Sequence, residues 1–216
     1  MTLQAMLFWT ICGGTAYVLG SLPFGFLIAR ARGVDIRTVG SGNIGATNVF
    51  RTVSKPLGLL TFALDFGKGL CGVLLLPLLI GRAFDAPADS KGLALFCGAL
   101  TVVGHNWTCF LGFKGGKGVA TSAGMLLGLS PAGVGIAFAA CVAVFLTSRY
   151  VSLASIAAAA ALAVAVWPLH RASEGLWFPL VLTLLALLAV WKHRANIARL
   201  RTGTESRFTF RKRTPA

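Results

Sequence analysis

The sequence has little charge of either sign, and acidic residues are especially few. Only 12% of the 216 residues are charged, with 6 Asp and Glu against 20 Lys and Arg, whereas an ordinary soluble domain has about 25%. Hydrophobic residues make up 56% of the chain, and its mean hydropathy is +0.79. Charge-free apolar runs of about 18 or more residues are typical of membrane-spanning helices. The composition argues against an ordinary soluble domain and predicts an all-α integral membrane protein.

The sequence also lacks the patterns of a disulfide framework or a metal site. Its five cysteines all lie in apolar segments, and none forms a C-x-x-C pair. An odd number of buried cysteines argues against both kinds of site. We therefore expect no metal and no cofactor. The first segment, MTLQAMLFWTICGG, lacks the basic start of a signal peptide, so we expect a retained first helix.

Apolar segments along the chain predict the membrane spans. They cover 2–29, 56–81, 92–113, 118–148, 150–169 and 175–191. The run 118–148 is too long for one crossing of about 20 residues, and LSPAG in its middle is a turn signal. The basic loop 30–55 and the basic tail 192–216 should both face the cytoplasm, which requires an even number of crossings between them.

Splitting the long run satisfies that requirement. The prediction is a single domain over 1–216, a bundle of about seven transmembrane helices with the N-terminus outside and the C-terminus cytoplasmic. Much of the net charge of +14 then reflects topology.

The stretch GSGNIGATNVFR, residues 40–51, is the first candidate for chemistry. Its glycines let the backbone bend close to a ligand, and successive amides in such a turn can form an anion site. A helix beginning near Gly45 would point its first amides at the same place, and Arg51 on that helix could bind a phosphate with both arms. A tight loop capped by Ser and Asn explains the residues equally well.

The stretch LDFGKG places Asp65 and Lys68 three residues apart, on one helix face. Charges at membrane depth are usually functional or paired. The pair can neutralise itself or contact a substrate, and both hold if the aspartate orients the lysine.

The stretch GHNWTCFLGFKGGKGVATS, residues 104–122, contains a second glycine-rich basic turn. It departs from a Walker A loop, because Leu111 stands where a glycine is required and Gly118 where a hydroxyl residue is required. We therefore reject an ATPase, but a glycine turn with a cation beside a helix start still suits a phosphate. A lone histidine such as His105 is more often a packing residue than a substrate ligand.

The stretch HRANIARLRTGTE, residues 193–205, follows the last span. A basic segment there is typical of contact with anionic lipid. Asn196 and Glu205 are unusual choices for that role. The predicted topology places all four stretches on the cytoplasmic side.

Two other classes of protein fit less well. A transporter for a phosphorylated metabolite would often show inverted repeats and a midplane site, but the two halves differ and the polar stretches lie at one face. A nucleic-acid binder is disfavoured, because the aromatic residues are in the spans rather than among the basic residues.

In combination, these stretches resemble the acyl-phosphate-dependent glycerol-3-phosphate acyltransferases of bacteria. The matching pieces also include GSLPFG and RYVSLASI, and together they run from Gly20 to Glu205. The resemblance implies a seven-helix bundle in the bacterial inner membrane with its site at the cytoplasmic face. It implies transfer of a fatty acyl group from acyl phosphate to the 1-hydroxyl of sn-glycerol 3-phosphate. The products are lysophosphatidic acid and inorganic phosphate, in the first acylation of phospholipid synthesis.

The resemblance also implies which residues act. The expected catalytic residues are Ser41, Arg51, Lys117, His193 and Asn196. The expected substrate-binding residues are Gly42, Asn43, Gly45, Thr47, Asn48, Asp65, Lys68, His105, Lys114, Gly115, Gly116, Gly118, Thr121, Ser122 and Glu205. The expected partners are acyl phosphate, glycerol 3-phosphate and membrane lipid, with no nucleic acid and no metal.

The chemistry of an acyl phosphate fits such a site. It is an activated mixed anhydride, so the protein mainly has to hold two anions together and stabilise developing charge. The common acyltransferase signature His-x-x-x-x-Asp is absent, since Phe110, Gly175 and Ala198 follow the three histidines at that spacing. We therefore expect direct transfer in which a substrate phosphate oxygen takes the hydroxyl proton. An acyl-enzyme on Ser41 or Cys109 is the alternative.

Overall fold

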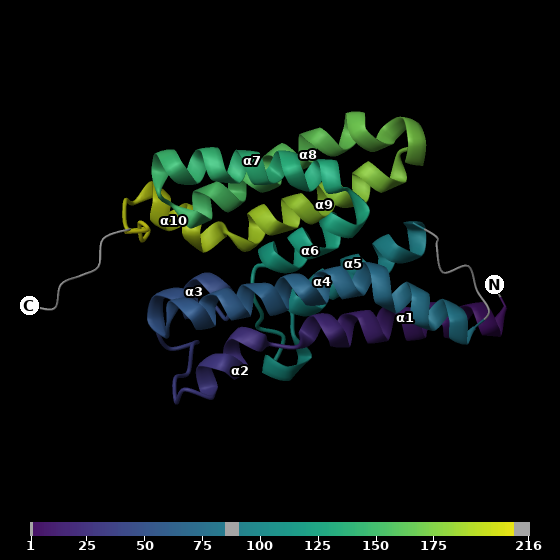
Figure 1. The fold of residues 1–216 in the computed structure, drawn as a ribbon, viewed down its shortest axis with the longest axis horizontal. Coiled ribbons are helices and arrows are strands. Elements are labelled where there is room, and N and C mark those ends of the chain that lie inside the picture. The colour runs from purple at the N-terminus through teal and green to yellow at the C-terminus, as the bar shows by residue number, and fades with distance from the viewer. Residues whose placement is uncertain (1, 85–90, 210–216) are drawn as a thin grey trace, which may run out of the picture. The chain divides into compact units, whose positions relative to one another are not determined.

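The computed structural model of the chain describes residues 2–84 and 91–209, and every regular element in these ranges is a helix (Figure 1). The helices are α1 (Leu3–Ser21), α2 (Phe24–Arg30), α3 (Ala46–Thr52), α4 (Lys55–Ala83), α5 (Lys91–Asn106), the 3₁₀ helix η1 (Cys109–Leu111), α6 (Val119–Leu129), α7 (Pro131–Ser148), α8 (Val151–Glu174), α9 (Trp177–Lys192) and α10 (Arg194–Arg201). They form two compact units, Met1–Pro131 and Ala132–Ala216. That the whole chain acts as one membrane domain stays a prediction.

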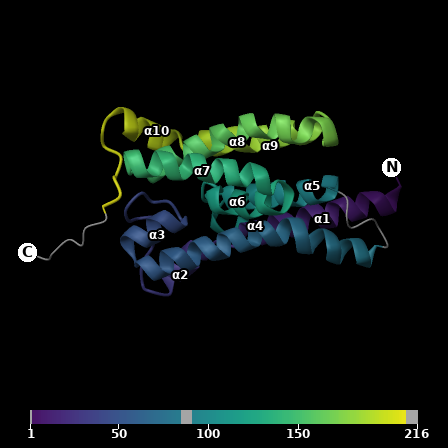
Figure 2. The same ribbon diagram turned by 45° about the horizontal axis from the view of Figure 1, so that its top comes forward.

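The first unit is built around α4, which packs against α1, α5 and α6 (Figures 1 and 2). Glycines allow the close approach of α4 and α6. A Cβ on Gly69 would lie 2.0 Å from the carbonyl oxygen of Thr121, and one on Gly124 would lie 1.9 Å from that of Phe66. Small residues at a helix contact are typical of membrane bundles, where close packing replaces the hydrophobic effect.

In the second unit, α8 and α9 lie side by side (Figure 1). The indole nitrogen of Trp167 donates to the hydroxyl of Thr183 across this contact, at 3.1 Å. Helix α10 follows α9 at a bend of 52°. The segment after α10 then returns to the start of α8, where the amide of Phe208 donates to the carbonyl of Arg149 at 2.8 Å. The predicted basic tail is therefore folded through residue 209; the rest of it lies outside the described residues.

The predicted spans 2–29 and 92–113 correspond to two segments long and apolar enough to cross a membrane, Leu3–Arg30 and Lys91–Leu111, but neither is one uninterrupted α-helix. The expected helix over 2–29 is broken, because Pro23 has no amide hydrogen and excludes Leu22 from helical geometry; α1 ends at Ser21 and α2 begins at Phe24. The span 92–113 is α-helical only through Asn106, and η1 follows it. Two other predictions are confirmed: α3 begins after Gly45, and the run 118–148 divides at Ser130.

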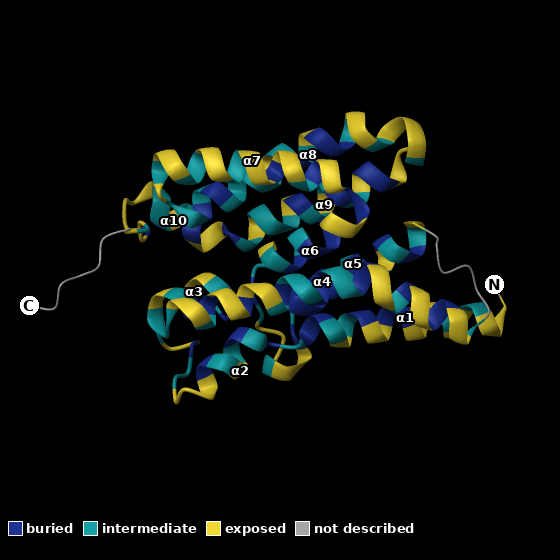
Figure 3. Ribbon diagram, viewed as in Figure 1, coloured by how far each residue is buried: buried dark blue, intermediate teal, exposed yellow. Residues whose placement is uncertain are grey.

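Within the described ranges, five helical segments are long and apolar enough to cross a membrane, or six if the bent pair α9–α10 counts as one. Many of their large apolar residues are exposed, such as Leu79, Phe138 and Val164. Exposed stretches, drawn in yellow, recur along these helices in Figure 3. Such a surface suits lipid and not water. Helix α6 has 11 residues, or about 16 Å, against about 30 Å of hydrocarbon. The count of seven crossings and the orientation of the termini stay predictions.

Candidate active site

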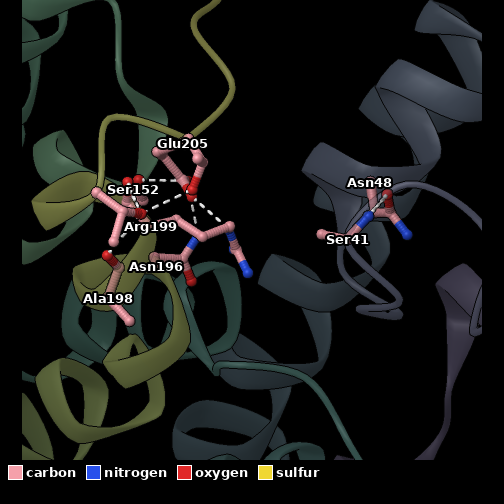
Figure 4. A network of polar contacts seen from close by, with 9 residues as sticks. Ser41, Asn48, Ser152, Asn196, Ala198, Arg199 and Glu205 are labelled. Atoms are coloured by element: carbon pink, nitrogen blue, oxygen red, sulfur yellow. Dashed lines mark hydrogen bonds and ion pairs between the residues drawn. The ribbon is translucent and has the colours of Figure 1, made fainter.

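Asn48 organises the glycine-rich loop of the first unit (Figure 4). Its buried side-chain amide donates to the carbonyls of Ile36, Val39 and Asn43 at 2.9–3.1 Å. Its Oδ1 accepts from the amide of Ser41 at 3.0 Å. One neutral side chain thus replaces the backbone partners that an irregular loop lacks.

The conformation of this loop requires glycine at two points and leaves its polar tip open. Gly40 and Gly42 have φ of +60° and +68°, where other residues are strained. A Cβ on Gly40 would also lie 2.3 Å from the Asn48 Oδ1. Ser41 and Thr47 are exposed, and so is Arg51 one turn further along α3. Of the predicted residues, Ser41, Thr47 and Arg51 are therefore exposed, whereas Asn48 is buried and holds the loop.

The start of α3 is fixed by Asn43, whose Oδ1 accepts from the amide of Gly45 at 2.9 Å. The preceding turn has its own ion pair, in which Arg37 contacts Asp35 at 2.7 Å. Hydrogen bonds from the Arg37 side chain and backbone lower the pKa of Asp35 to about 2. The positive charge of Arg37 is thus matched locally by Asp35.

Asp65, Lys68 and His105 form a buried cluster. The Asp65 Oδ1 lies 2.9 Å from the Lys68 Nζ and 3.5 Å from the His105 Nδ1. Lys68 also donates to the carbonyl of Leu22 at 2.8 Å and lies over the ring of Phe24. The predicted sharing of one face by Asp65 and Lys68 is confirmed, and the pair is joined to the break between α1 and α2. Substrate contact by these three residues stays a prediction.

The second glycine turn lies directly on the end of α5. The amide of Gly116 donates to the carbonyl of His105 at 3.0 Å. A Cβ on Gly115 would be 2.1 Å from that carbonyl oxygen, and one on Gly118 would be 2.8 Å from the Asn106 Oδ1. Gly118 also has a φ of +79°. Close approach is therefore the main reason for glycine in this turn.

The two lysines of the glycine turn are accessible to different degrees, and two hydroxyl residues follow them at the start of α6. Lys114 is exposed and Lys117 is half-buried. Thr121 and Ser122 follow in the first turn of α6, and neither buried hydroxyl oxygen has a hydrogen-bond partner in the described part of the chain. These hydroxyls have unused hydrogen-bonding capacity beside the glycine turn.

Glu205 organises the second unit after α10 (Figure 4). Its Oε1 accepts from the Ser152 hydroxyl and from the Asn196 amide, each at 2.7 Å. Its Oε2 accepts from the Arg199 Nε at 2.7 Å. Burial raises the pKa of Glu205, but these three hydrogen bonds outweigh that effect and hold its pKa below the ordinary value. Glu205 thus has a full set of protein donors.

His193 and Asn196 lie at the α9–α10 bend, and both are buried. The His193 Nδ1 lies 2.8 Å from the carbonyl of Ala189, which favours the tautomer with hydrogen on Nδ1 and an acceptor at Nε2. The Asn196 amide nitrogen is held by Glu205, while its Oδ1 has no hydrogen-bond partner among the described residues. Both side chains are therefore held in defined orientations.

The structure thus groups the predicted residues in four places, one of which is the buried cluster of Asp65, Lys68 and His105. Ser41, Arg51 and their neighbours share one loop and helix, Lys117 and the glycine turn share the end of α5, and His193, Asn196 and Glu205 share the α9–α10 bend. Sequence reasoning missed Ser152 and Arg199, which hold Glu205, and Asn106, which lies against Gly118. For Ser152 and Asn106 the available signal was a polar residue within an apolar segment.

The chain is similar in sequence to a large set of bacterial enzymes. The family model for glycerol-3-phosphate acyltransferase matches residues 10–203. The glycerol-3-phosphate acyltransferase of Desulforudis audaxviator is 50% identical over 92% of this chain and 95% of its own length. That of Geobacter metallireducens is 52% identical over 89% of this chain and 94% of its own length.

Solved structures agree with the sequence comparison. A crystal structure of PlsY (YgiH), an integral membrane glycerol 3-phosphate acyltransferase, in its glycerol 3-phosphate form has a TM-score of 0.80 and 40% identity, and covers 93% of this chain and 96% of that chain. Its lysophosphatidic acid form has a TM-score of 0.77 and 39% identity over 93% and 95%. The chain is therefore an all-helical, multi-pass integral membrane protein and belongs to the glycerol-3-phosphate acyltransferase family.

Proposed function

We propose that the protein transfers a fatty acyl group from acyl phosphate to the 1-hydroxyl of sn-glycerol 3-phosphate. The products are lysophosphatidic acid and inorganic phosphate, and the reaction is the first acylation of phospholipid synthesis. Family membership supports the acceptor, and the solved relative is known in a glycerol 3-phosphate form and in a lysophosphatidic acid form. The carrying observation is the loop held by Asn48, at which Ser41 in the loop and Arg51 on the following helix α3 are both exposed.

In this proposal, five residues carry catalysis. Arg51 and Lys117 bind phosphate groups, because each cation follows a glycine-rich turn that a phosphate can approach. Ser41 donates its hydroxyl hydrogen to a substrate oxygen. His193 and Asn196 present an imidazole nitrogen and an amide oxygen, both held in place from behind, to substrate hydroxyls. Holding the two reactants in line lowers the barrier without a metal or a further cofactor.

The transfer is direct. The 1-hydroxyl oxygen of the acceptor forms a bond to the acyl carbon, and the bond from that carbon to the phosphate oxygen breaks. The hydroxyl proton passes to a substrate phosphate oxygen. Arg51 and Lys117 stabilise the negative charge that develops on the leaving phosphate. The sequence offers no His-x-x-x-x-Asp pair that would serve as a protein base.

We further propose that the protein resides in the bacterial inner membrane with these residues facing the cytoplasm. The excess of Lys and Arg in the 30–55 loop and after the last span supports that orientation. Glycerol 3-phosphate, a water-soluble anion, would then reach the loops from the cytoplasm. Membrane lipid surrounds the exposed apolar faces of the helices.

The donor is tested with purified protein in detergent. Glycerol 3-phosphate is offered with acyl phosphate, with acyl coenzyme A or with acyl carrier protein, and lysophosphatidic acid is measured by mass spectrometry. We expect product with acyl phosphate alone among the three donors. Product from a thioester at a comparable rate would contradict the proposed donor, and no product from any donor would favour a transporter.

The site and the direct route are tested by variants and by trapping. Ser41→Ala, Arg51→Ala and Lys117→Ala should each lower turnover by about 100-fold or more while melting near the wild-type temperature, because the first two side chains are exposed and Lys117 is half-buried. Near-normal rates in all three would remove the site assignment. Incubation with labelled acyl phosphate alone should leave the protein unlabelled, and a stoichiometric acyl-protein would contradict direct transfer.

A further inference from the structure

The cluster Asp65–Lys68–His105 lies between two other features of the first unit. Lys68 reaches the carbonyl of Leu22, which the break before Pro23 leaves without a helical partner. The other side of the cluster is the ring of His105, which lies against the glycine turn. All three side chains are buried, with 2–5% of their surface exposed. Removing one partner of such a buried ion pair leaves the other charge buried and unpaired, which is strongly destabilising.

The ring of His105 lies directly against Gly116. A Cβ built on Gly116 would lie 2.0 Å from the His105 Nε2, and its next neighbours, at 2.9 and 3.0 Å, are also atoms of that ring. The backbone amide of Gly116 donates to the His105 carbonyl at the same place. The imidazole is thus in contact with the backbone of the turn, while its Nδ1 faces the Asp65 carboxylate at 3.5 Å.

The neighbouring glycine has a different environment. A Cβ on Gly115 would meet the carbonyl oxygen of His105 at 2.1 Å and the backbone of Asn106 at 2.8 Å. These are main-chain atoms of α5, which no side-chain substitution removes. Gly115 and Gly116 therefore form a matched pair for substitution. A side chain at Gly115 would collide with the backbone of α5, and a side chain at Gly116 would collide with the His105 ring.

We propose that His105 and Asp65 are positioning residues that set the glycine turn carrying Lys117. The inference rests on the proposed function and deepens it. Asp65, held by Lys68, orients the imidazole of His105. The imidazole sets the distance of the Gly116 backbone from α5. That distance in turn sets the position from which Lys117 reaches the substrate phosphate. In this role His105 and Asp65 act on the substrate through the turn.

The proposal predicts a specific rescue. In the wild-type background, Gly116→Ala should lower kcat/KM for glycerol 3-phosphate roughly 10- to 100-fold, since displacing a binding group by about 1 Å has effects of that size. In a His105→Ala background the same change should lower it by less than about threefold, because the ring that clashes is gone. Gly115→Ala should lower it by the same factor in both backgrounds, within about twofold.

The kinetic constants identify the route of the effect. His105→Ala and Gly116→Ala should change the same constant, kcat or the KM of the same substrate, as Lys117→Ala changes. His170→Gln is the control histidine, on α8 with its ring tilted against that of Phe178, and should keep wild-type constants. If His105→Ala does not fold, His105→Asn serves as the background, because its side chain ends short of Gly116.

Melting temperature gives a readout that does not need activity. Gly116→Ala should lower it in the wild-type background and lower it much less in the His105→Ala background. Equal damage by Gly116→Ala in both backgrounds, in rate and in melting, would overturn the positioning role. A wild-type protein without transferase activity would defeat the proposed function, and the rescue in melting would still decide the present inference.

Discussion

Asn48 and Glu205 are two buried polar side chains that each hold an irregular segment, and they do so in different ways (Figure 4). Asn48 is neutral and bonds to backbone groups of residues 36–43, all within 12 positions of itself. Glu205 is charged and accepts from three side chains, one of them 53 positions away. The first arrangement shapes a local loop. The second holds the chain after α10 against α8 and α10.

The difference has consequences for stability. Losing Asn48 leaves several backbone groups without partners, and each buried one costs about 1–3 kcal/mol. Losing the Glu205 carboxylate removes charge-assisted hydrogen bonds from side chains, one of which, Arg199, is 36% exposed and can be solvated instead. The neutral local network should therefore be the more sensitive of the two, and it should not respond to pH.

The largest expected effect is that of Asn48→Asp. A carboxylate cannot donate to the three carbonyls that Asn48 now serves, so we expect unfolding free energy to fall by about 3 kcal/mol or more and transferase activity to be lost. Thermal melting and phosphate release measure the two effects. The control is Asn43→Asp, which keeps the acceptor for the Gly45 amide and should melt near wild type. Equal melting of both variants would contradict the role of Asn48.

Glu205→Gln should have the next largest effect. The glutamine side chain has the same shape, but its NH2 group would face one of the three hydrogen-bond donors that now bind Glu205. We therefore expect the free energy of unfolding to fall by about 1–3 kcal/mol at neutral pH. Asp35→Asn removes an exposed ion pair and should cost clearly less. If Asp35→Asn lowered the free energy of unfolding more than Glu205→Gln does, the greater importance of the buried carboxylate would be contradicted.

The two regions should also differ in their response to acid. The pKa of Glu205 is lowered in the folded protein, so its stabilising effect is fully present above its unfolded pKa of about 4.3 and is lost as the pH falls through the folded pKa. The melting temperatures of wild type and Glu205→Gln should therefore converge on acidification from pH 7. The gap between wild type and Asn48→Ala should lack this convergence, because Asn48 does not titrate. A constant gap for Glu205→Gln would contradict the lowered pKa.

The smallest expected effects are those of Gly33→Ala and Gly42→Ala. Both glycines have positive φ, +74° and +68°, so each alanine should cost about 1–2 kcal/mol of backbone strain. A Cβ on Gly33 meets nothing within 4 Å, whereas one on Gly42 lies 3.0 Å from the Arg37 carbonyl oxygen. Only Gly42→Ala should therefore also lower activity, by changing the tip that carries Ser41. Equal activity of the two variants would show that the tip tolerates the shift.

The contrast between Asn48 and Glu205 also explains what the sequence could predict. The loop before α3 and the helix start after Gly45 were predictable, because glycine, serine and asparagine act there on their immediate neighbours. The contact of Ser152 with Glu205 was not, since it joins residues 53 positions apart. The contact of His105 with Gly116 depends on how the turn lies on α5, which the motif alone does not encode.

Hydropathy predicted the spans better than their interruptions. Uniform apolar composition hid the break at Leu22–Pro23 and the end of α5 at Asn106, because neither is marked by a charge. The turn signal of LSPAG was strong enough to divide the long run correctly, between Leu129 and Pro131. Local backbone chemistry was therefore the better guide to where helices end.

We propose above that this chain joins an acyl group from acyl phosphate to glycerol 3-phosphate directly. The most direct measurement follows both products in one reaction of the purified protein with acyl phosphate and glycerol 3-phosphate. The account predicts one 1-acyl-glycerol 3-phosphate for each inorganic phosphate released, from the first turnover onward, and no release without the acceptor. Phosphate released in a burst without acceptor, or in excess over the acylated product, would contradict it.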